Sequence, residues 1–275
     1  MNRKIMLSIR TRLQSVYLIA FCFIMLTYAC KKSEQHSVDP TKDKEKPGPG
    51  TVAVQVPSSI NSELLRIEFN YEGETNRLME ISQSDGKLTK FFYRPDGLPL
   101  KQEHYKDKKL QQEINYLIDK AGQIYKIYLF DSKSAPIGYY AISYDDEKRI
   151  SALKKHGPNN LLQEEETISY DHLGNAVSIS IVNTSKTTKM TGIYDDKLSI
   201  YRNIPYVQLL LFNQDQARIS FSKSNPLGID YSSPGSTGSI YTYEYNSDNY
   251  PTSFKRKQGT ITETTKLTYK AIKPK

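Results

Sequence analysis

Acidic side chains gather at three places in the sequence, and paired carboxyl groups are what most glycoside-cleaving enzymes use. The clusters are Asp145-Asp146-Glu147, Glu164-Glu165-Glu166 and Asp195-Asp196. A facing pair could cleave a glycosidic bond, and a denser group of oxygens could hold calcium. The aspartates, however, directly follow strand-type tyrosines, where an Asp side chain accepts hydrogen bonds from the N–H groups of a tight turn. We therefore expect turn-forming aspartates and a solvated run of glutamates, and we assign no catalytic residue.

Histidines, cysteines and short motifs point to no other chemistry. His104, His156 and His172 lie far apart, without the spacing of metal ligands. The sequence holds no Gly-x-Ser-x-Gly elbow, P-loop or dinucleotide-binding fingerprint. Cys22 and Cys30 are the only cysteines and both fall in the first thirty residues, so the remainder can form neither a disulfide nor a thiolate metal site. We expect no metal site and no cofactor.

Tyrosine is the aromatic residue that could bind a ligand, since the chain has 21 Tyr and no Trp. An exposed aromatic ring can stack on a sugar ring, and its hydroxyl group can reach a polar partner. Tyrosines recur at one fixed place in each of six repeat units, and this regular placement predicts that most of them are core residues. The clustered extras, Tyr139-Tyr140 and the pair Tyr241 and Tyr243, are the candidate ligand-binding residues.

The elements that would position these residues are repeated β-hairpins. The stretch Ile168–Asn175 alternates apolar and polar residues and then runs into a tight turn, as a strand with one buried face does. Its tyrosine aligns with others spaced 22, 23, 28 and 26 residues apart along the chain, with a further unit 24 residues beyond. These aligned tyrosines are Tyr71, Tyr93, Tyr116, Tyr144, Tyr170 and Tyr194. Similar spacing over six units indicates a structural repeat.

The repeat predicts an all-β fold, a long antiparallel meander of hairpins. Outward positions in the strands are polar, which argues against a barrel embedded in lipid. One flat sheet of so many strands would accumulate twist and expose its edges, so we expect it to curl into a soluble, barrel-like shape. Asn203–Phe212 breaks the rhythm and predicts a short helix or plug near residues 204–212. Ser222–Gly238 is rich in Ser, Pro and Gly and is expected to be a loop.

The N-terminal sequence resembles a targeting signal. A basic segment precedes the apolar run Val16–Leu26, as in a signal peptide, and Cys30 follows at a position that suits lipidation. We expect a lipoprotein signal peptide over residues 1–29, a disordered tether over 30–50 and a single β domain over 51–275. Half of the formal charge of +8 lies in the signal peptide, so a nucleic-acid partner is not expected. The expected partner is a membrane, bound through lipid on Cys30.

Two resemblances follow from these residues. Tyr170-Asp171-His172-Leu173-Gly174-Asn175 resembles the YD repeats of RHS-type bacterial surface proteins; the dipeptide is intact at 144, 170 and 194, whereas Glu72, Arg94 and Leu117 replace the aspartate in earlier units. The order of later motifs, from Tyr194-Asp195 through Asn203-Ile204-Pro205-Tyr206 to Tyr243-Glu244-Tyr245-Asn246, is similar to a lipoprotein family of unknown function with a porin-like fold. The resemblance implies a water-soluble barrel on an anchored lipoprotein, and it supplies no catalytic residues.

Three hypotheses on function follow. The first is a non-enzymatic lipoprotein of the outer membrane, facing the periplasm or the cell surface, that binds a glycan or another envelope component. The second is a polysaccharide-acting enzyme with carboxylates at the mouth of the barrel. The third is a structural or adhesion scaffold. A wide mouth lined by tyrosines would favour binding, and a fully packed interior would favour the scaffold.

Overall fold

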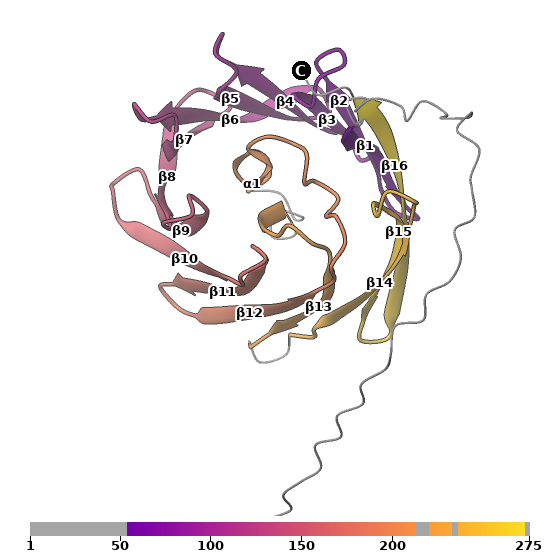
Figure 1. Cartoon of the computed structure of the whole chain (residues 1–275). Helices are drawn as coiled ribbons and strands as arrows, with labels where there is room; N and C mark the ends of the chain where they lie inside the picture. The colour runs from indigo at the N-terminus through magenta and orange to yellow at the C-terminus, as the bar shows by residue number, and fades with distance from the viewer. Residues whose placement is uncertain (1–53, 213–219, 233–235, 273–275) are drawn as a thin grey trace, which may run out of the picture. The chain divides into compact units, whose positions relative to one another are not determined.

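The computed structural model describes residues 54–212, 220–232 and 236–272. The expected signal peptide, the lipidation site Cys30 and the tether lie outside these residues. The described residues form sixteen strands and one short helix, and Figure 1 shows the strands arranged as a ring around the helix. The strands are β1 (Val54–Ser62), β2 (Arg66–Tyr71), β3 (Leu78–Gln83), β4 (Lys87–Tyr93), β5 (Pro99–Lys106), β6 (Lys109–Ile118), β7 (Ile124–Asp131), β8 (Pro136–Tyr144), β9 (Ile150–His156), β10 (Leu162–Tyr170), β11 (Ala176–Asn183), β12 (Thr187–Tyr194), β13 (Pro226–Tyr231), β14 (Ser239–Tyr245), β15 (Pro251–Gln258) and β16 (Ile261–Ile272).

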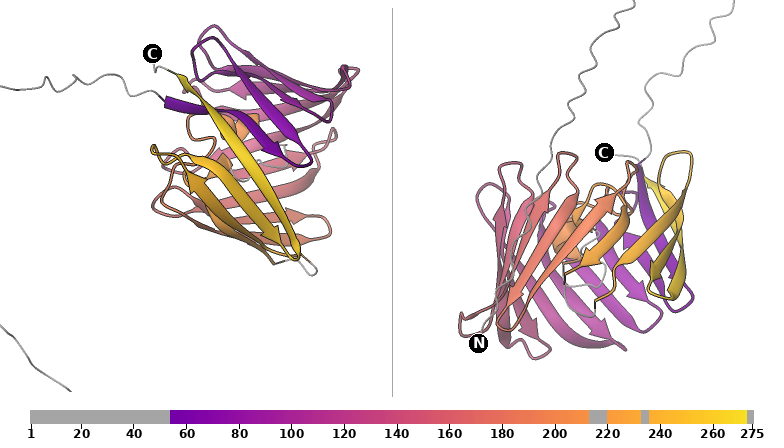
Figure 2. Two further views of the ribbon diagram at one scale, coloured as in Figure 1. Left: turned by 90° about the vertical axis from the view of Figure 1, so that its right-hand side faces the viewer. Right: turned by 90° about the horizontal axis from the view of Figure 1, so that it is seen from below.

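The strands close into one barrel. Each pairs antiparallel with its neighbours in sequence, and β1 pairs with β16 from Val54↔Ile272 to Ser62↔Thr265. Figure 2 shows β1 and β16 side by side in the wall, with the start of β1 and the end of β16 at the same rim. Each of the described strands therefore has a partner on both sides. The predicted antiparallel meander, curled into a barrel-like sheet, is confirmed.

Aspartates build the tight turns, as the repeat predicts. Asp171 follows β10, and its Oδ1 accepts hydrogen bonds from the backbone N–H groups of Leu173 at 2.9 Å and Asn175 at 2.8 Å. Gly174 in the same turn has φ of +86°, a conformation that suits glycine. Asp145 makes the equivalent pair of bonds after β8. The turn role of these aspartates is confirmed.

The tyrosines at the strand ends bind the neighbouring strand through their hydroxyl groups. Six of them donate a hydrogen bond of 2.5 to 2.9 Å to a carbonyl oxygen of the preceding strand. The pairs are Tyr71 with Pro57, Tyr93 with Leu78, Tyr144 with Ile124, Tyr170 with Ile150, Tyr194 with Ala176 and Tyr269 with Pro251. Five of the six pack against the core inside the barrel, namely Tyr71, Tyr93, Tyr144, Tyr170 and Tyr269. These units of the repeat therefore share the same hydrogen-bonded corner, at the same rim.

The third unit of the repeat was aligned on the wrong residue, Tyr116. β6 ends at Ile118, and Asp119 after it accepts hydrogen bonds from the N–H groups of Ala121 and Gln123, as Asp171 does in its own turn. The alignment on Tyr116 was therefore wrong by two residues, because this unit carries isoleucine at the corner position. Tyr116 lies further inside the barrel and is 6% exposed.

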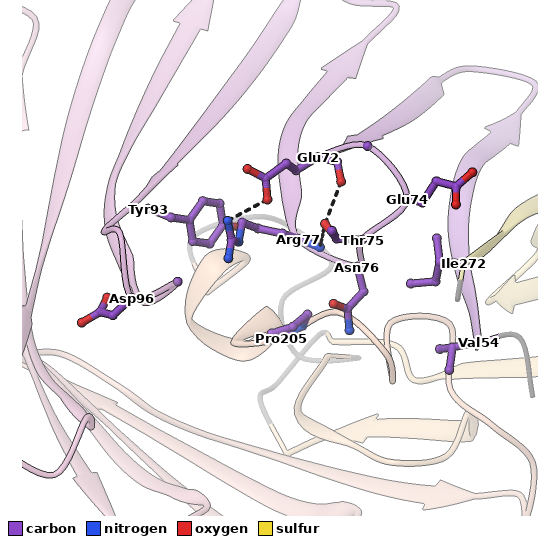
Figure 3. A pocket seen from close by; sticks show the side chains of 12 residues that line it. Val54, Glu72, Glu74, Thr75, Asn76, Arg77, Tyr93, Asp96, Pro205 and Ile272 are labelled. Atoms are coloured by element: carbon purple, nitrogen blue, oxygen red, sulfur yellow. Dashed lines mark hydrogen bonds and ion pairs between the residues drawn. The ribbon is translucent and has the colours of Figure 1, made fainter. Parts of the chain in front are cut away.

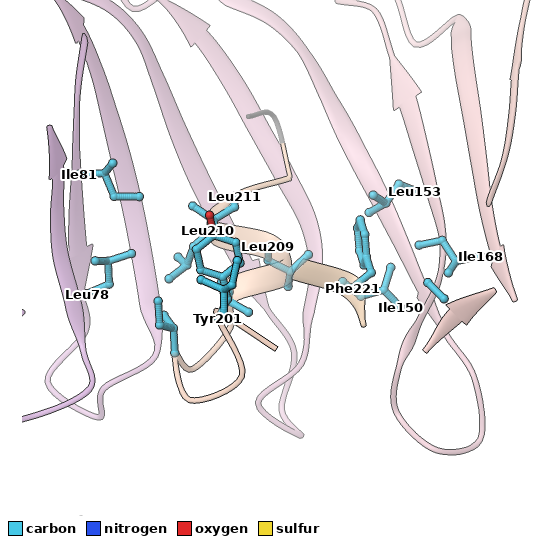
Figure 4. Packing of buried hydrophobic residues seen from close by; sticks show 14 of the residues in the cluster. Leu78, Ile81, Ile150, Leu153, Ile168, Tyr201, Leu209, Leu210, Leu211 and Phe221 are labelled. Carbon is cyan, nitrogen blue, oxygen red and sulfur yellow. The ribbon is translucent and has the colours of Figure 1, made fainter. Parts of the chain in front are cut away.

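The segment between β12 and β13 folds back into the barrel as a plug, defined here as residues 195–212 and 220–225. Its one helix, α1, spans Val207–Leu210. Figure 4 shows Tyr201, Leu209 and Leu210 surrounded by wall residues. The side-chain amide of Gln102 on β5 donates to the carbonyl oxygen of Leu210 at 3.0 Å, and the Tyr116 hydroxyl donates to that of Leu209 at 3.1 Å. The predicted plug is confirmed.

The helix of the plug is shorter than Asn203 and Pro205 suggested. It begins after Tyr206, which has φ of +59° and no side-chain cap. Asn203 does not cap it, because its side-chain amide donates to the carbonyl oxygen of Gln55 at 2.7 Å and to the hydroxyl of Tyr250 at 2.6 Å. The residue that resembled a helix cap instead fastens the plug to the wall.

The expected loop over Ser222–Gly238 contains a strand. β13 (Pro226–Tyr231) pairs with β12 and, through Gly228↔Ile240 and Ile229↔Ser239, with β14. Pro226 is its first residue, where proline's missing N–H group is tolerated. The proline and glycine residues made this segment look like a loop, although it forms the strand that connects β12 to β14 in the closed barrel.

The outer wall carries charges in ion pairs across and along the strands. Arg66 and Glu68 pair at 2.6 Å, and Lys154 on β9 meets Glu165 on β10 at 3.1 Å. A lipid-facing wall would present an apolar band instead. The apolar side chains point inward and pack on the plug. The core of the protein is therefore the interior of the barrel.

Candidate functional site

A large cavity opens at the rim where the aspartate turns, the start of β1 and the end of β16 lie. Its volume is about 950 Å³. The six-residue turn between β2 and β3 forms one side, the turn between β4 and β5 another, and Pro205 of the plug the floor (Figure 3). We call it the mouth cavity; its lining residues are Val54, Glu72, Gly73, Glu74, Thr75, Asn76, Arg77, Tyr93, Asp96, Gly97, Pro205 and Ile272.

The β2–β3 turn is held in place by its own polar groups. Arg77 Nη1 meets Glu72 Oε2 at 2.6 Å, and the guanidinium carbon lies 5.4 Å from the ring centroid of Tyr93. The Thr75 hydroxyl donates to the carbonyl oxygen of Glu72 at 2.8 Å. The side-chain amide of Asn76 donates to the carbonyl oxygen of Asn203 at 2.8 Å, which joins the turn to the plug. The cavity wall is therefore preorganised.

Burial raises the pKa of the Tyr93 phenol, while the nearby Arg77 charge opposes the shift. Tyr93 therefore stays neutral and acts as a hydrogen-bonding group with an aromatic face. Among the lining residues, Glu72, Glu74 and Asp96 carry negative charge and Arg77 carries the positive charge. The mouth cavity offers acceptors and donors for hydroxyl groups, and the ion pairs Glu72–Arg77 and Asp96–Arg94 leave it without a strong net charge.

Two of the three mouth carboxylates are engaged with arginines. Glu72 pairs with Arg77, and Asp96 Oδ2 meets Arg94 Nη2 at 2.9 Å. In Figure 3 the Asp96 carboxylate points away from Glu72, so these two groups do not face each other across the cavity. This arrangement suits hydrogen bonding to a bound ligand more than the two-carboxylate chemistry of glycoside cleavage.

A second, smaller pocket lies inside the barrel and shares no lining residue with the mouth cavity. Its volume is about 280 Å³. We call it the lumen pocket; it is lined by Ile60, Ser62, Leu65, Ile67, Met190, Ile200, Tyr201, Ile229, Tyr231, Tyr241, Phe254, Arg256, Glu263 and Thr265. Ile200 and Tyr201 belong to the plug, and the other lining residues come from the wall and its turns.

The four candidate tyrosines do not form one site. Tyr241 is 7% exposed and lines the lumen pocket, so the expectation that it is exposed was wrong. Tyr243 stacks on it with ring centroids 6.4 Å apart. Tyr140 points inward and meets the ring of Phe212 edge-on at 5.0 Å. Period-two alternation places Tyr139 on the opposite face, where it stacks on His156 with centroids 4.6 Å apart. Burial raises the pKa of Tyr140 to about 12.

The acidic clusters serve the wall rather than a common site. Asp145 pairs with Arg149 at 2.7 Å, and the Asp195 carboxylate accepts from the N–H group of Asn225 at 3.0 Å and from the hydroxyl of Tyr245. In the described part of the chain no three or more His, Cys, Asp or Glu residues gather closely enough to hold a metal ion.

His104, one of the histidines of the sequence, lies inside the barrel beside Thr89. Its Nδ1 is 3.0 Å from the hydroxyl oxygen of Thr89. Burial lowers the pKa of His104 to about 4, so the ring is neutral near pH 7. It belongs to the interior of the barrel and to neither cavity.

The mouth residues were missed from the sequence, although one signal marks them. The turn from Glu72 to Arg77 is longer than its counterparts, such as Asp171–Asn175, and carries charge at both ends. That departure from the repeat is where the mouth cavity forms. Arg256 of the lumen pocket carried no signal, because its inward direction follows only from the pairing of β15.

None of the helices formed by the described residues is long and apolar enough to cross a membrane.

Comparisons with known proteins identify a similar fold but assign the chain to no family. No family model and no curated protein matches the chain. The crystal structure of a porin-like protein from Bacteroides uniformis is similar over 78% of this chain and 95% of that one, with 13% identity and a TM-score of 0.53. A porin-like protein from Bacteroides vulgatus matches 78% of this chain and 99% of its own, at 10% identity and a TM-score of 0.43. The Photorhabdus luminescens Tc holotoxin pore matches 73% of this chain and 11% of its own, at 14% identity and a TM-score of 0.28. The chain therefore shares its barrel fold with the porin-like protein of B. uniformis.

Proposed function

We propose that the protein is a lipid-anchored barrel of the bacterial outer membrane that binds a neutral, hydroxyl-rich glycan segment in its mouth cavity, without cleaving it. The observation that carries the proposal is the mouth cavity itself. At about 950 Å³ it is as large as the upper range of small-molecule pockets, which extends to ~1,000 Å³. An open cavity of this size, with a lining held by hydrogen bonds and ion pairs, supports ligand binding over a purely structural scaffold.

The chemistry of the lining supports a neutral sugar. Sugar hydroxyl groups both donate and accept, and the cavity presents carboxylates, an amide, a hydroxyl group and a guanidinium within one turn. Glu72 pairs with Arg77 and Asp96 with Arg94, so these charges largely balance, and the lining suits a neutral ligand better than a strongly charged one. Tyr93 adds an aromatic surface beside the polar groups.

Binding without catalysis is supported by the state of the mouth carboxylates. Glu72 and Asp96 are each held by an arginine, at 2.6 and 2.9 Å. A glycosidase needs two carboxyl groups that face the scissile bond from opposite sides, one of them as a proton donor. In our proposal these carboxylates orient a ligand and take no part in bond cleavage.

The proposed location at the outer membrane is supported by Cys30 and by the fold. Cys30 directly follows the signal-type apolar run, and a lipidated cysteine with two or more acyl chains anchors a protein stably. The fold likeness to a porin-like Bacteroides protein is consistent with the envelope. Replacing Cys30 by Ser should move the protein from the membrane to the soluble fraction; retention in the membrane would contradict the anchor.

The binding proposal is tested with an array of neutral bacterial and plant polysaccharides, probed with the full chain and its Cys30→Ser form. Binding should weaken at least fivefold in Glu72→Gln. Glu68→Gln is the matched control, because the two side chains have nearly equal exposure, 49% and 48%, and Glu68 lies outside the cavity. Absence of binding, or equal loss in both variants, would overturn the proposal. Release of reducing sugar ends from a bound glycan would establish the enzyme hypothesis instead.

A further inference from the structure

The structure assigns a second binding site to the lumen pocket, for a small amphiphile with an apolar body and an anionic head group. The inference does not rest on the mouth cavity, since the two share no lining residue. It is carried by three properties of the lumen pocket: the nature of its walls, the position of Arg256 and its volume.

One part of the lining is apolar. Met190 of β12 is 1% exposed, Ile229 of β13 is 5% exposed, and Ile60 of β1 is 4% exposed. The plug contributes Ile200 and Tyr201, each almost fully buried. This part suits an apolar group, whereas Arg256, Glu263 and Thr265 make another part polar, so the pocket as a whole suits an amphiphile.

Arg256 gives the pocket a charge. Among its described lining residues Arg256 is the one cation and Glu263 the one anion. Arg256 faces inward, because β15 pairs it with the inward-facing Tyr241 of β14. Its Nε donates to the hydroxyl of Ser239 at 3.2 Å, and its Nη2 donates to Oε1 of Gln258 at 2.6 Å. Two neutral groups thus orient the guanidinium.

Glu263 compensates that charge only in part. Its Oε2 lies 3.7 Å from Nη1 of Arg256, beyond hydrogen-bonding distance. Both side chains are partly exposed, at 36% and 44%. A carboxylate at the entrance could therefore approach Nη1 and form the charge-assisted hydrogen bond that Glu263 does not make.

The volume sets the size of the ligand. A cavity of ~150 Å³ holds one benzene molecule, so the lumen pocket has room for roughly ten non-hydrogen atoms. That corresponds to a medium-chain carboxylate, with its chain against Met190 and Ile229 and its head group at Arg256. A phospholipid or an oligosaccharide is too large for this pocket.

The test is calorimetric titration of octanoate into the full chain carrying Cys30→Ser. Octanoate should bind at one site, and 1-octanol, which has the same chain without the charge, should bind more weakly. Arg256→Gln should weaken octanoate binding about tenfold and leave 1-octanol binding unchanged. Glu263→Gln should strengthen octanoate binding by removing the competing charge.

Two further variants separate the pocket from non-specific effects. Lys257→Gln removes the same charge from the neighbouring, exposed position of β15 and should leave octanoate binding unchanged. Leu65→Phe adds bulk at the pocket wall and should block both ligands. The inference is overturned if octanoate does not bind to the parent chain, if Lys257→Gln acts like Arg256→Gln, or if Leu65→Phe binds octanoate as well as the parent. Loss of glycan binding at the mouth would leave these results unaffected.

Discussion

The hydroxyl group of Tyr170, at the end of β10, donates a 2.9 Å hydrogen bond to the carbonyl oxygen of Ile150, the first residue of β9. The same bond joins five other strand ends to the strand before them. It explains why the repeat uses tyrosine and not phenylalanine at its corners. The ring fills the core, and the hydroxyl satisfies a carbonyl group at the place where the strand register shifts.

Replacing Tyr170 by Phe should therefore destabilise the barrel although the ring remains. We expect a loss of about 1 kcal/mol in the free energy of unfolding, and up to ~3 if the Ile150 carbonyl is left without a partner. Urea denaturation followed by circular dichroism measures it. Tyr125→Phe is the control, since Tyr125 is 44% exposed and should change stability little. Equal effects of the two changes would show that the hydroxyl of Tyr170 contributes nothing.

Replacing Asp171 by Ala should cost about 1 to 2 kcal/mol of stability. The change removes the acceptor for two backbone N–H groups of the turn, whereas Asp171→Asn keeps one acceptor and should cost less. The neighbouring His172 is exposed, and His172→Ala should stay within ~0.5 kcal/mol. Denaturation midpoints of the three variants test this order. A costly His172→Ala beside a neutral Asp171→Ala would reverse our assignment of the turn.

Replacing Leu210 by Ala should show that the plug is part of the core. Leu210 is 1% exposed, and deleting a fully buried leucine side chain costs roughly 2 to 5 kcal/mol. Leu173→Ala, in an exposed turn, is the matched control at 53% exposure. A thermal melt that shifts equally little for both variants would mean that the plug leaves the barrel without loss of stability.

The pH dependence of stability should carry the signature of His104. Burial lowers the folded pKa of His104 to about 4, below the ordinary 6.5 of an unfolded chain. Its contribution is fully present above pH 6.5 and is lost as the pH falls through 4, because the unfolded state takes up the proton first. The loss amounts to about 3 kcal/mol at most.

In His104→Gln the free energy of unfolding should depend less on pH between pH 7 and 4.5, as measured by urea unfolding. Asp145 and Asp171 have pKa values held below 3.8, where burial is outweighed by hydrogen bonds from Arg149 and Asn175, respectively. Their contribution is present above pH 3.8 and is lost only at lower pH, so they do not disturb the window. A profile that His104→Gln leaves unchanged would contradict the assignment.

The sequence predicted the wall of this barrel better than its interior. Strand alternation and the Tyr-Asp corners are local, so the hairpins could be read from residues such as Tyr144 and Asp145. The same local pattern misled at two places. Isoleucine stands at the corner position Ile118 in place of tyrosine, and proline and glycine interrupt the alternation in Pro226–Tyr231. Each error came from one residue type that had been given too much weight.

The two cavities could not be predicted, because they depend on distant pairings. The mouth cavity is lined by both Val54 and Ile272, which meet only through closure of β1 on β16. Arg256 lines the lumen pocket because a bulge between Glu244 and Tyr245 sets the register of β14 and β15. A shift of one residue would turn its side chain to the outside.

The pairing of β1 with β16 also decides how the protein must fold. The first strand cannot find its partner until β16 is available, so a partly folded chain carries an open sheet with two unpaired edges. Contacts of such large sequence separation form slowly. A chain that stops before Ile261 would lack β16 and retain those edges permanently, and we expect it to aggregate or be degraded. Completion of the folded barrel thus depends on the twelve-residue strand β16.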